Sequence, residues 1–252
     1  MDNRPIGMFD SGVGGLTVYR EIKKIMPGQK IIYVGDTKRF PYGSKTKETI
    51  IEASQECIDF LKSKDVKEVI IACGTATSQA LDTVREIYEL PINGIIEPTV
   101  EYIKKEGYKR IGVIATRGTI DSNSWEKNLK NKIENVKVFN QACPLLAPMA
   151  EEGWTENEIA RLTLIEYLKN FENLDALILG CTHYPLFEKL IEEILPNVKI
   201  INTGKVIAKY LDNKYESKQD EVEDEFYLSD TQCNFIDVAD KILNKKIEIR
   251  EM

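Results

Sequence analysis

The 252-residue sequence has few of the residues on which several kinds of functional site depend. His183 is the only histidine, so no other imidazole can act as a base. The five cysteines are odd in number and contain no Cys-x-x-Cys pair, which argues against a zinc knuckle and against a thioredoxin-type motif. No apolar run approaches the ~20 residues of a membrane-spanning helix.

The charge balance excludes further classes. The net charge of -7 argues against nucleic acid as a partner, because binding phosphates requires a basic protein face. The apolar and charged fractions, 42% and 30%, are ordinary for a soluble protein. Residues 1–5 lead directly into an expected strand, without the apolar core of a signal peptide. We therefore expect a cytoplasmic protein with free thiols, no nucleic-acid partner and no membrane association.

Apolar runs of strand length alternate with helical periodicity, which predicts an α/β fold with mostly parallel sheets. The expected strands are 5–9, 30–34, 69–73, 92–96, 110–115, 136–139, 177–179, 198–201, 226–228 and 247–249. The expected helices are 16–25, 45–63, 75–90, 97–106, 123–132, 156–171, 186–195, 204–211 and 234–243. A glycine turn is expected at 116–119, and a charge-rich linker at 213–225.

Two pairs of matching landmarks indicate an internal duplication. Ile6-Gly7 corresponds to Ile111-Gly112 at an offset of 105 residues, and Cys73 corresponds to Cys181 at an offset of 108. Each cysteine ends an apolar strand. A repeat of one α/β unit predicts two pseudo-symmetric halves, with the active site in the cleft between them.

Paired cysteines at strand ends suggest a particular chemistry. Open α/β sheets bind ligands at the carboxyl ends of their strands. Two thiols facing each other across a substrate suit a reaction that removes a proton from one face and returns one to the other, as in racemisation or epimerisation. A free thiol has a pKa near ~8.5, so each cysteine needs assistance. His183 can assist Cys181, and Asp10 can assist Cys73 or bind a substrate ammonium group.

The loop after the first strand, residues 10–15, lacks the G-x-G-x-x-G fingerprint and a Walker lysine. The carboxylate of Asp10 would repel a phosphate. A structural alternative is that Asp10 or Ser11 caps the following helix. Hydroxyl and N–H groups at Ser11, Thr75, Thr182 and the 116–119 turn are candidate donors to substrate carboxylates.

Other interpretations remain open at this stage. Both cysteines can be buried small apolar residues. Cys181 and His183 can form half of a metal site, but the sequence offers no clear partner pair, so no metal is expected. A Cys–His hydrolase would leave Cys73 without a role. Cys57, Cys143 and Cys233 are interpreted as packing residues.

A set of motifs, in order and close to family spacing, resembles the glutamate racemases. The motifs are Asp10-Ser11-Gly12-Val13-Gly14-Gly15, Pro41-Tyr42-Gly43, Ala72-Cys73 with Thr75-Ala76, Ala115-Thr116 with Gly118-Thr119, and Gly180-Cys181-Thr182-His183-Tyr184-Pro185-Leu186. The resemblance implies cofactor-independent interconversion of L- and D-glutamate, which supplies D-glutamate for bacterial peptidoglycan. It also implies two α/β domains, 1–96 plus 206–252 and 97–205, because the end of the chain, past about residue 205, returns to pack on the first domain. In many members it implies a homodimer.

The resemblance further assigns roles to residues. It makes Cys73 and Cys181 the catalytic acid and base, with Asp10 and His183 as their assistants. Glu151 matches a family carboxylate on the Cys181 side. The substrate-binding residues that it implies, together with those expected from the residue pattern, are Asp10, Ser11, Pro41, Tyr42, Gly43, Gly74, Thr75, Thr116, Thr119, Thr182 and His183.

The sequence departs from the family pattern directly after the first cysteine. The family has Cys-Asn-Thr-Ala-Ser, whereas this chain has Cys73-Gly74-Thr75-Ala76-Thr77. The Asn side chain is a substrate contact in the family, and one lost hydrogen bond to a charged ligand costs about 1.5–3 kcal/mol, or roughly ten- to hundredfold in affinity. We therefore expect a glutamate racemase with weakened or altered substrate binding. The alternatives are an aspartate racemase and a non-catalytic amino-acid-binding homologue.

Overall fold

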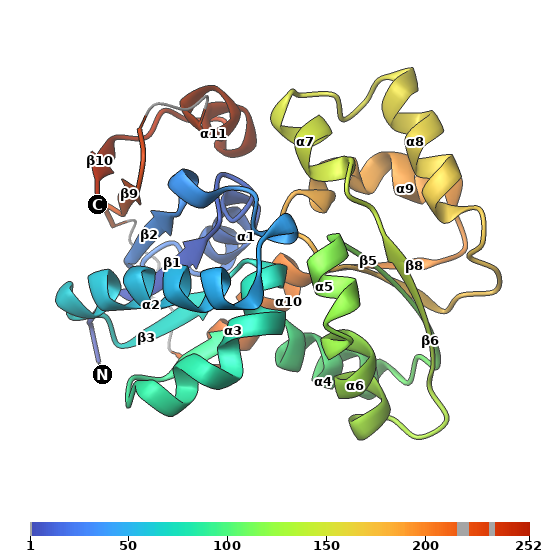
Figure 1. Ribbon diagram of the computed structural model, residues 1–252, viewed down its shortest axis with the longest axis horizontal. Helices are drawn as coiled ribbons and strands as arrows, with labels where there is room; N and C mark the ends of the chain where they lie inside the picture. Colours follow the sequence, from blue (N-terminus) through green and yellow to red (C-terminus); the bar gives the residue numbers. More distant parts are fainter. Residues whose placement is uncertain (1, 216–221, 232–234) are drawn as a thin grey trace.

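The computed structural model describes residues 2–215, 222–231 and 235–252, which form two parallel sheets lying side by side (Figure 1). The first sheet has the order β10-β9-β2-β1-β3-β4 and the second β6-β5-β7-β8. The first comprises β1 (Ile6–Asp10), β2 (Ile31–Gly35), β3 (Glu68–Ile71), β4 (Ile92–Gly94), β9 (Glu225–Leu228) and β10 (Ile249–Glu251). The second comprises β5 (Arg110–Ala115), β6 (Lys137–Ala142), β7 (Ala176–Leu179) and β8 (Lys199–Asn202). The expected α/β fold is confirmed.

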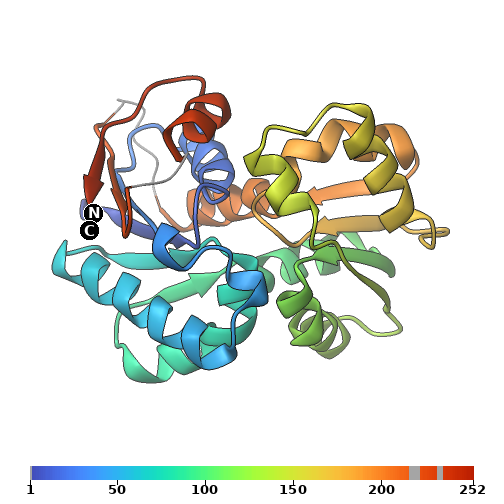
Figure 2. The ribbon, with the colours of Figure 1, turned by 45° about the horizontal axis from the view of Figure 1, so that its top comes forward.

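Helices cover both faces of each sheet (Figure 2). The first sheet has α1 (Leu16–Ile25), α10 (Thr203–Lys214) and α11 (Phe235–Leu243) on one face, and α2 (Lys47–Ser63) and α3 (Gly74–Ile87) on the other. The second has α4 (Ile96–Glu106) and α6 (Ser124–Lys132) on one face, and α7 (Leu146–Glu151), α8 (Glu158–Leu168) and α9 (Glu188–Ile194) on the other. Neighbouring strand residues point to opposite faces, so Met8 packs on the α1 side and Phe9 on the α2 side.

The register of the two sheets explains the repeat seen in the sequence. Ile6 in β1 pairs with Glu68 in β3, and Ile111 in β5 pairs with Ala176 in β7. Both pairs therefore share the 105- and 108-residue offsets of the sequence landmarks. Cys73 and Cys181 each lie five residues beyond the paired residue of their own strand. The two cysteines thus occupy corresponding positions at the carboxyl ends of corresponding strands.

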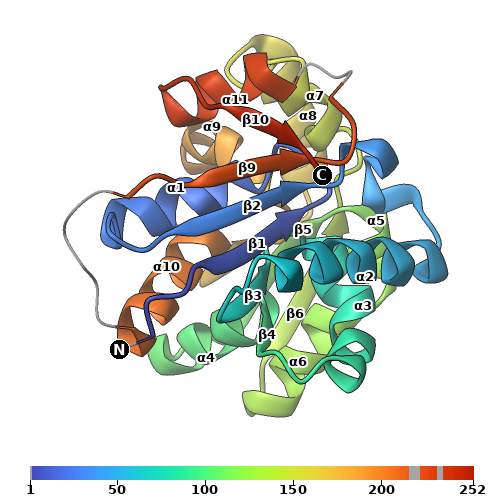
Figure 3. The same ribbon diagram turned by 90° about the vertical axis from the view of Figure 1, so that its left-hand side faces the viewer.

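The chain passes between the sheets through α4 and α10, which also pack against each other. After α10 it returns to the first sheet, where β9 pairs with β2 (Figure 3). One apolar cluster runs from the first sheet through α10 and α4 to the second. The expected domain boundaries fall within the first turns of α4 and α10, and the division into 1–96 plus 206–252 and 97–205 stays a prediction.

Besides shifts of a few residues at the ends of elements, the structure differs from the sequence expectation in the 116–119 turn, the 213–225 linker and the cap of α1. A short helix, α5 (Arg117–Asp121), replaces the turn expected at 116–119, because the Thr116 hydroxyl caps it by accepting the Thr119 N–H at 3.3 Å. Helix α10 extends to Lys214, into the expected linker, whose residues 216–221 lie outside the described part of the chain. Neither Asp10 nor Ser11 caps α1, which begins only at Leu16 without a side-chain cap.

None of the described helices is long and apolar enough to cross a membrane. Three short 3-10 segments complete the connections: η1 (Thr37–Arg39), η2 (Tyr42–Ser44) and η3 (Tyr184–Phe187). Two of them follow the first-sheet strand β2, and the third follows Cys181. They therefore lie in the strand-end loops that surround the two cysteines.

Candidate active site

Cys73 and Cys181 line the same small cavity between the two sheets. Each lies two residues beyond the end of its strand, β3 or β7, and is almost fully buried, with 5% and 6% of its surface exposed. The cavity is lined by Ser11, Phe40, Pro41, Tyr42, Gly43, Cys73, Gly74, Thr75, Thr116, Ala147, Cys181, Thr182 and His183. Its volume of about 20 Å³ holds little more than one water molecule. An amino acid therefore enters only if the walls move apart.

Three of the site residues expected from the sequence lie behind the cavity wall. Asp10, Thr119 and Glu151 are absent from the lining, but each hydrogen-bonds a side chain that belongs to it. The sequence analysis missed two lining residues, Phe40 and Ala147. Phe40 is an aromatic residue within an otherwise polar loop, and its ring lies 5.8 Å from that of His183. Ala147 gives no signal beyond its place on the apolar helix α7.

The Cys181 thiol faces an imidazole that is held in place from behind. His183 Nδ1 lies 3.8 Å from Cys181 Sγ, and its Nε2 lies 2.8 Å from Glu151 Oε1. Burial alone would lower the pKa of His183, but the hydrogen bonds to Cys181 and Glu151 outweigh it and raise the pKa to about 10. The imidazole is therefore protonated at neutral pH. The Cys181 sulfur therefore lies beside a cation, which marks Cys181 as a candidate acid or base.

The Cys73 thiol has a different environment. Burial, and then the nearby Asp10 carboxylate, raise its pKa to about 12, so that it keeps its proton at neutral pH. Its nearest side-chain partner is the Ser11 hydroxyl, 3.8 Å from Sγ. Cys73 also precedes the first residue of α3, whose free N–H groups stabilise a negative charge. The same residue can thus donate a proton and then carry the resulting charge.

Asp10 is fully buried behind these thiols, and burial raises its pKa. Oδ1 accepts the Gly12 N–H at 3.1 Å, and Oδ2 accepts the Thr182 hydroxyl at 3.1 Å. The carboxylate therefore connects the loop after β1 with the loop after β7. In this arrangement it faces protein donors and not the cavity.

The glycine loop permits a close approach between the two halves. A Cβ atom at Gly14 would lie 2.5 Å from Thr182 Oγ1 and 2.6 Å from the His183 ring, so no side chain fits there. Beside it, the Thr17 hydroxyl donates to the Thr182 carbonyl at 2.7 Å. This packing, and not phosphate binding, accounts for the glycine.

Three threonine hydroxyls form a mutual cluster where α3 meets α5. Thr75 Oγ1 lies 2.9 Å from Thr116 Oγ1 and 3.2 Å from Thr119 Oγ1, and the latter two are 2.9 Å apart. Thr75 belongs to the first sheet's helix and the other two to the second sheet. Two of the three line the cavity. The cluster can turn hydroxyl donors toward a carboxylate, as the sequence predicts.

The 40–43 loop is fixed by a buried carboxylate that the sequence analysis did not single out. Asp36 is fully buried and accepts hydrogen bonds from the Tyr42 hydroxyl at 2.6 Å and from the Ser229 hydroxyl at 2.7 Å. Arg39 pairs with the same carboxylate at 3.1 Å. The Tyr42 hydroxyl therefore donates its proton to Asp36, although Tyr42 lines the cavity.

Two of the remaining cysteines lie outside the cavity. Cys57 and Cys143 are buried in apolar clusters, on the α2 side of the first sheet and beside α7, and neither lines the cavity. Burial raises the pKa of both thiols. The packing interpretation is confirmed for these two, and Cys233 lies outside the described residues.

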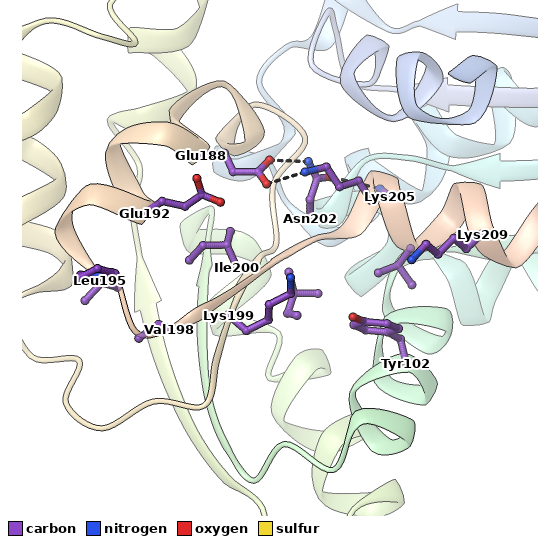
Figure 4. A pocket seen from close by; sticks show the side chains of 13 residues that line it. Tyr102, Glu188, Glu192, Leu195, Val198, Lys199, Ile200, Asn202, Lys205 and Lys209 are labelled. Carbon is purple, nitrogen blue, oxygen red and sulfur yellow. Dashed lines mark hydrogen bonds and ion pairs between the residues drawn. The ribbon is translucent and has the colours of Figure 1, made fainter. Parts of the chain in front are cut away.

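A second cavity, of about 500 Å³, lies between β8, α9, α10 and α4 (Figure 4). Its wall includes Glu188, which accepts from Asn202 Nδ2 at 3.0 Å and from Lys205 Nζ at 2.7 Å. Among the described residues that line it there is no thiol, no imidazole and none of the expected site residues. Size alone therefore does not mark the site, and the small cavity between the cysteines is the better candidate.

Comparisons with known proteins agree with this choice. The Asp/Glu/Hydantoin racemase family model matches residues 6–211. A curated glutamate racemase from Sulfurihydrogenibium sp. is 40% identical over 256 residues, covering 98% of each chain. The crystal structure of glutamate racemase from Francisella tularensis in complex with D-glutamate is 37% identical, with a TM-score of 0.91 over 100% of this chain and 98% of that one. A Bacillus anthracis glutamate racemase structure is 34% identical, with a TM-score of 0.92 over 100% and 98%.

Proposed function

This chain belongs to the Asp/Glu/Hydantoin racemase family and is an isomerase, and we propose that it interconverts L- and D-glutamate by moving the α-proton between Cys181 and Cys73. One observation carries the proposal. Two thiols at corresponding strand ends of two sheets line one cavity. A hydrolase or a metal site would use Cys181 and His183 but would leave Cys73 without a role.

The charged imidazole beside Cys181 and the protonated thiol of Cys73 suggest the order of events. The Cys181 thiolate, beside protonated His183, removes the α-proton and becomes a thiol, and the electron pair of the broken C–H bond passes into the substrate carboxylate. The Cys73 thiol then gives its proton to the opposite face of the α-carbon. Cys73 becomes a thiolate at the N-terminus of α3, and the enantiomer is complete. The reverse reaction exchanges the two roles.

The side chains around the thiols suggest how the substrate is held. Hydroxyls of Ser11, Thr75 and Thr116 line the cavity and can donate to its carboxylates. Gly43 and Gly74 bring backbone to the same wall. Asp10 and Glu151 act through Thr182 and His183, to which they are hydrogen-bonded. Proton transfer between two thiols requires no cofactor and no metal.

The resemblance to glutamate racemases supports the wider parts of the proposal. We place the enzyme in the cytoplasm, where D-glutamate is supplied for peptidoglycan. We also propose a homodimer. Helix α8 is apolar on both faces, and its Ile159, Leu162 and Ile165 are 54%, 57% and 43% exposed, so a second copy has an apolar face to cover. Light scattering of the purified chain, with Leu162→Glu beside it, tests the dimer.

The experiment for the proposed reaction follows the optical activity of L-glutamate by circular dichroism. The native chain should abolish the signal, and Cys73→Ala and Cys181→Ala should each leave it unchanged. Cys57→Ala and Cys143→Ala are matched controls, because both thiols are buried outside the cavity, and their folded fractions should racemise normally. Rotation lost with L-aspartate but not with L-glutamate would indicate an aspartate racemase. Binding without any loss of rotation would indicate a non-catalytic homologue.

A further inference from the structure

Gly74 is in direct contact with the backbone of the opposite half of the molecule. A Cβ atom at this position would lie 2.1 Å from the carbonyl oxygen of Gly180 and 3.2 Å from its carbonyl carbon. Real Cβ atoms essentially never approach another heavy atom within 3.0 Å. The obstacle is main chain, so no side-chain rotation relieves it. Gly74 is the first residue of α3 and has no left-handed backbone conformation. Glycine is required there because the Gly180 carbonyl leaves no space for a Cβ atom.

Gly180 cannot retreat from this contact. Its N–H donates to the Ile114 carbonyl of β5 at 2.8 Å. On its own side, a Cβ atom at Gly180 would lie 3.0 Å from that carbonyl oxygen and 3.1 Å from Trp125 Nε1. Trp125 is itself buried between α6 and the second sheet. A side chain at position 74 would therefore push the two halves apart.

The contact involves the two residues that adjoin the thiols. Gly74 directly follows Cys73, and Gly180 directly precedes Cys181. The separation of the two loops at this point consequently determines the separation of the two sulfur atoms. In a reaction that needs a thiol on each face of one carbon, a misplacement of about 1 Å can cost about a hundredfold in rate.

We propose that Gly74 is a positioning residue that sets how closely Cys73 and Cys181 approach a substrate between them. This inference rests on the proposed racemase function and refines it. It differs from the sequence-based interpretation of Gly74 as a lost substrate contact, because the Gly180 carbonyl lies where a Cβ atom at position 74 would be.

The test compares Gly74→Ala and Gly74→Asn with the native chain in deuterated water. Racemisation is followed by circular dichroism, and exchange of the α-proton by NMR. Both variants should lose about a hundredfold in kcat, with KM changed by less than about threefold. When the second thiol is too distant, the first returns a solvent deuteron to the face it left, so exchange with retention should outpace inversion. Native kcat in Gly74→Ala, or a higher kcat/KM in Gly74→Asn, would overturn the proposal.

Gly107→Ala is the matched control. Gly107 ends α4 at a φ of +79° with nothing within 4 Å of its Cβ position, so alanine there strains the backbone without touching the site. It should lower the unfolding temperature and leave kcat and the ratio of exchange to inversion at native values. A shift in that ratio would mean that general destabilisation, and not the contact at Gly74, is responsible.

A readout without turnover separates this inference from the proposed function. Both thiols are at least 94% buried in the closed arrangement, so alkylation by iodoacetamide depends on opening. Peptide mass spectrometry should find Cys73 and Cys181 alkylated several-fold faster in Gly74→Ala than in the native chain, and Cys57 unchanged. A native chain that does not racemise glutamate refutes the proposed function. Equal alkylation rates refute the positioning role of Gly74.

Discussion

The imidazole Nε2 of His183 lies 2.8 Å from Glu151 Oε1, although Glu151 is not part of the cavity wall. Glu151 lies at the end of α7, and the other ring nitrogen of His183, Nδ1, lies 3.8 Å from Cys181 Sγ. Glu151 is one of the groups that raise the pKa of His183 to about 10. It therefore helps to keep the positive charge of the imidazole beside the Cys181 sulfur.

Glu151→Gln should shift the alkaline limit of activity to lower pH. The native enzyme should lose activity as His183 deprotonates near pH 10, and the variant should do so earlier because one cause of the raised pKa is gone. The profile of kcat/KM against pH, measured with each enantiomer, checks this. Glu152→Gln, on the exposed neighbouring carboxylate, should behave as the native chain. Superimposable profiles for Glu151→Gln and the native chain would contradict the role of Glu151.

The hydrogen bond between His183 and Glu151 should also make the free energy of unfolding depend on pH. The folded chain holds the His183 proton more tightly than the unfolded chain, whose histidine has its ordinary pKa of 6.5. The resulting stabilisation is complete below about pH 6.5 and is lost as the pH rises toward 10. Urea unfolding across this range should show a smaller decline in Glu151→Gln than in the native chain.

Asp10→Asn should stabilise the protein and inactivate it. Burial raises the pKa of Asp10, so its charge opposes folding at any pH above the ordinary value of 3.8. Asparagine keeps an acceptor for the Gly12 N–H and has no charge. Urea unfolding at pH 7 should require more denaturant, the gain should vanish near pH 3, and kcat should fall about a hundredfold or more. A variant that is less stable and fully active would show that Asp10 is only structural.

Asp36 should act on catalysis through Tyr42. Tyr42→Phe removes the hydroxyl that donates to Asp36, and Asp36→Asn weakens the acceptor, so each should lower kcat/KM by roughly tenfold. Because both changes break one hydrogen bond, the double variant should be little worse than either single one, with a coupling of about 1.4 kcal/mol. Steady-state kinetics of the four proteins gives this cycle directly. Fully additive losses would mean that the two residues act separately.

The sequence was sufficient for the parts of the fold that local patterns determine. Apolar runs and their offsets placed Cys73 and Cys181 at corresponding strand ends, because strand register repeats between the two sheets. Local patterns gave the wrong element where contacts with other residues determine the backbone conformation. Gly118 reads as a turn residue, yet it lies inside α5 because Thr116 caps the helix.

The site shows the same division. Motifs identified most of the cavity wall, but Phe40 enters it from the loop after β2 and Ala147 from helix α7, and neither residue belongs to one of these motifs. The buried carboxylate of Asp36 reads as an ordinary turn residue until Tyr42 and Ser229 are seen beside it. Gly74 reads as a missing amide until Gly180 is seen in its place. Contacts between the two halves could not be predicted, because a sequence pattern describes one segment and these contacts join two distant ones.

The most direct test of two thiols on opposite faces is the position of deuterium early in the reaction. L-glutamate is incubated with the native chain in deuterated water, and after a few per cent conversion both enantiomers are separated and examined by mass spectrometry. Because one thiol removes the proton and the other supplies one equilibrated with solvent, the D-glutamate should be deuterated and the remaining L-glutamate unlabelled. Deuterium in the remaining L-glutamate at a rate equal to inversion would indicate a single base, and would contradict the pairing of Cys73 with Cys181.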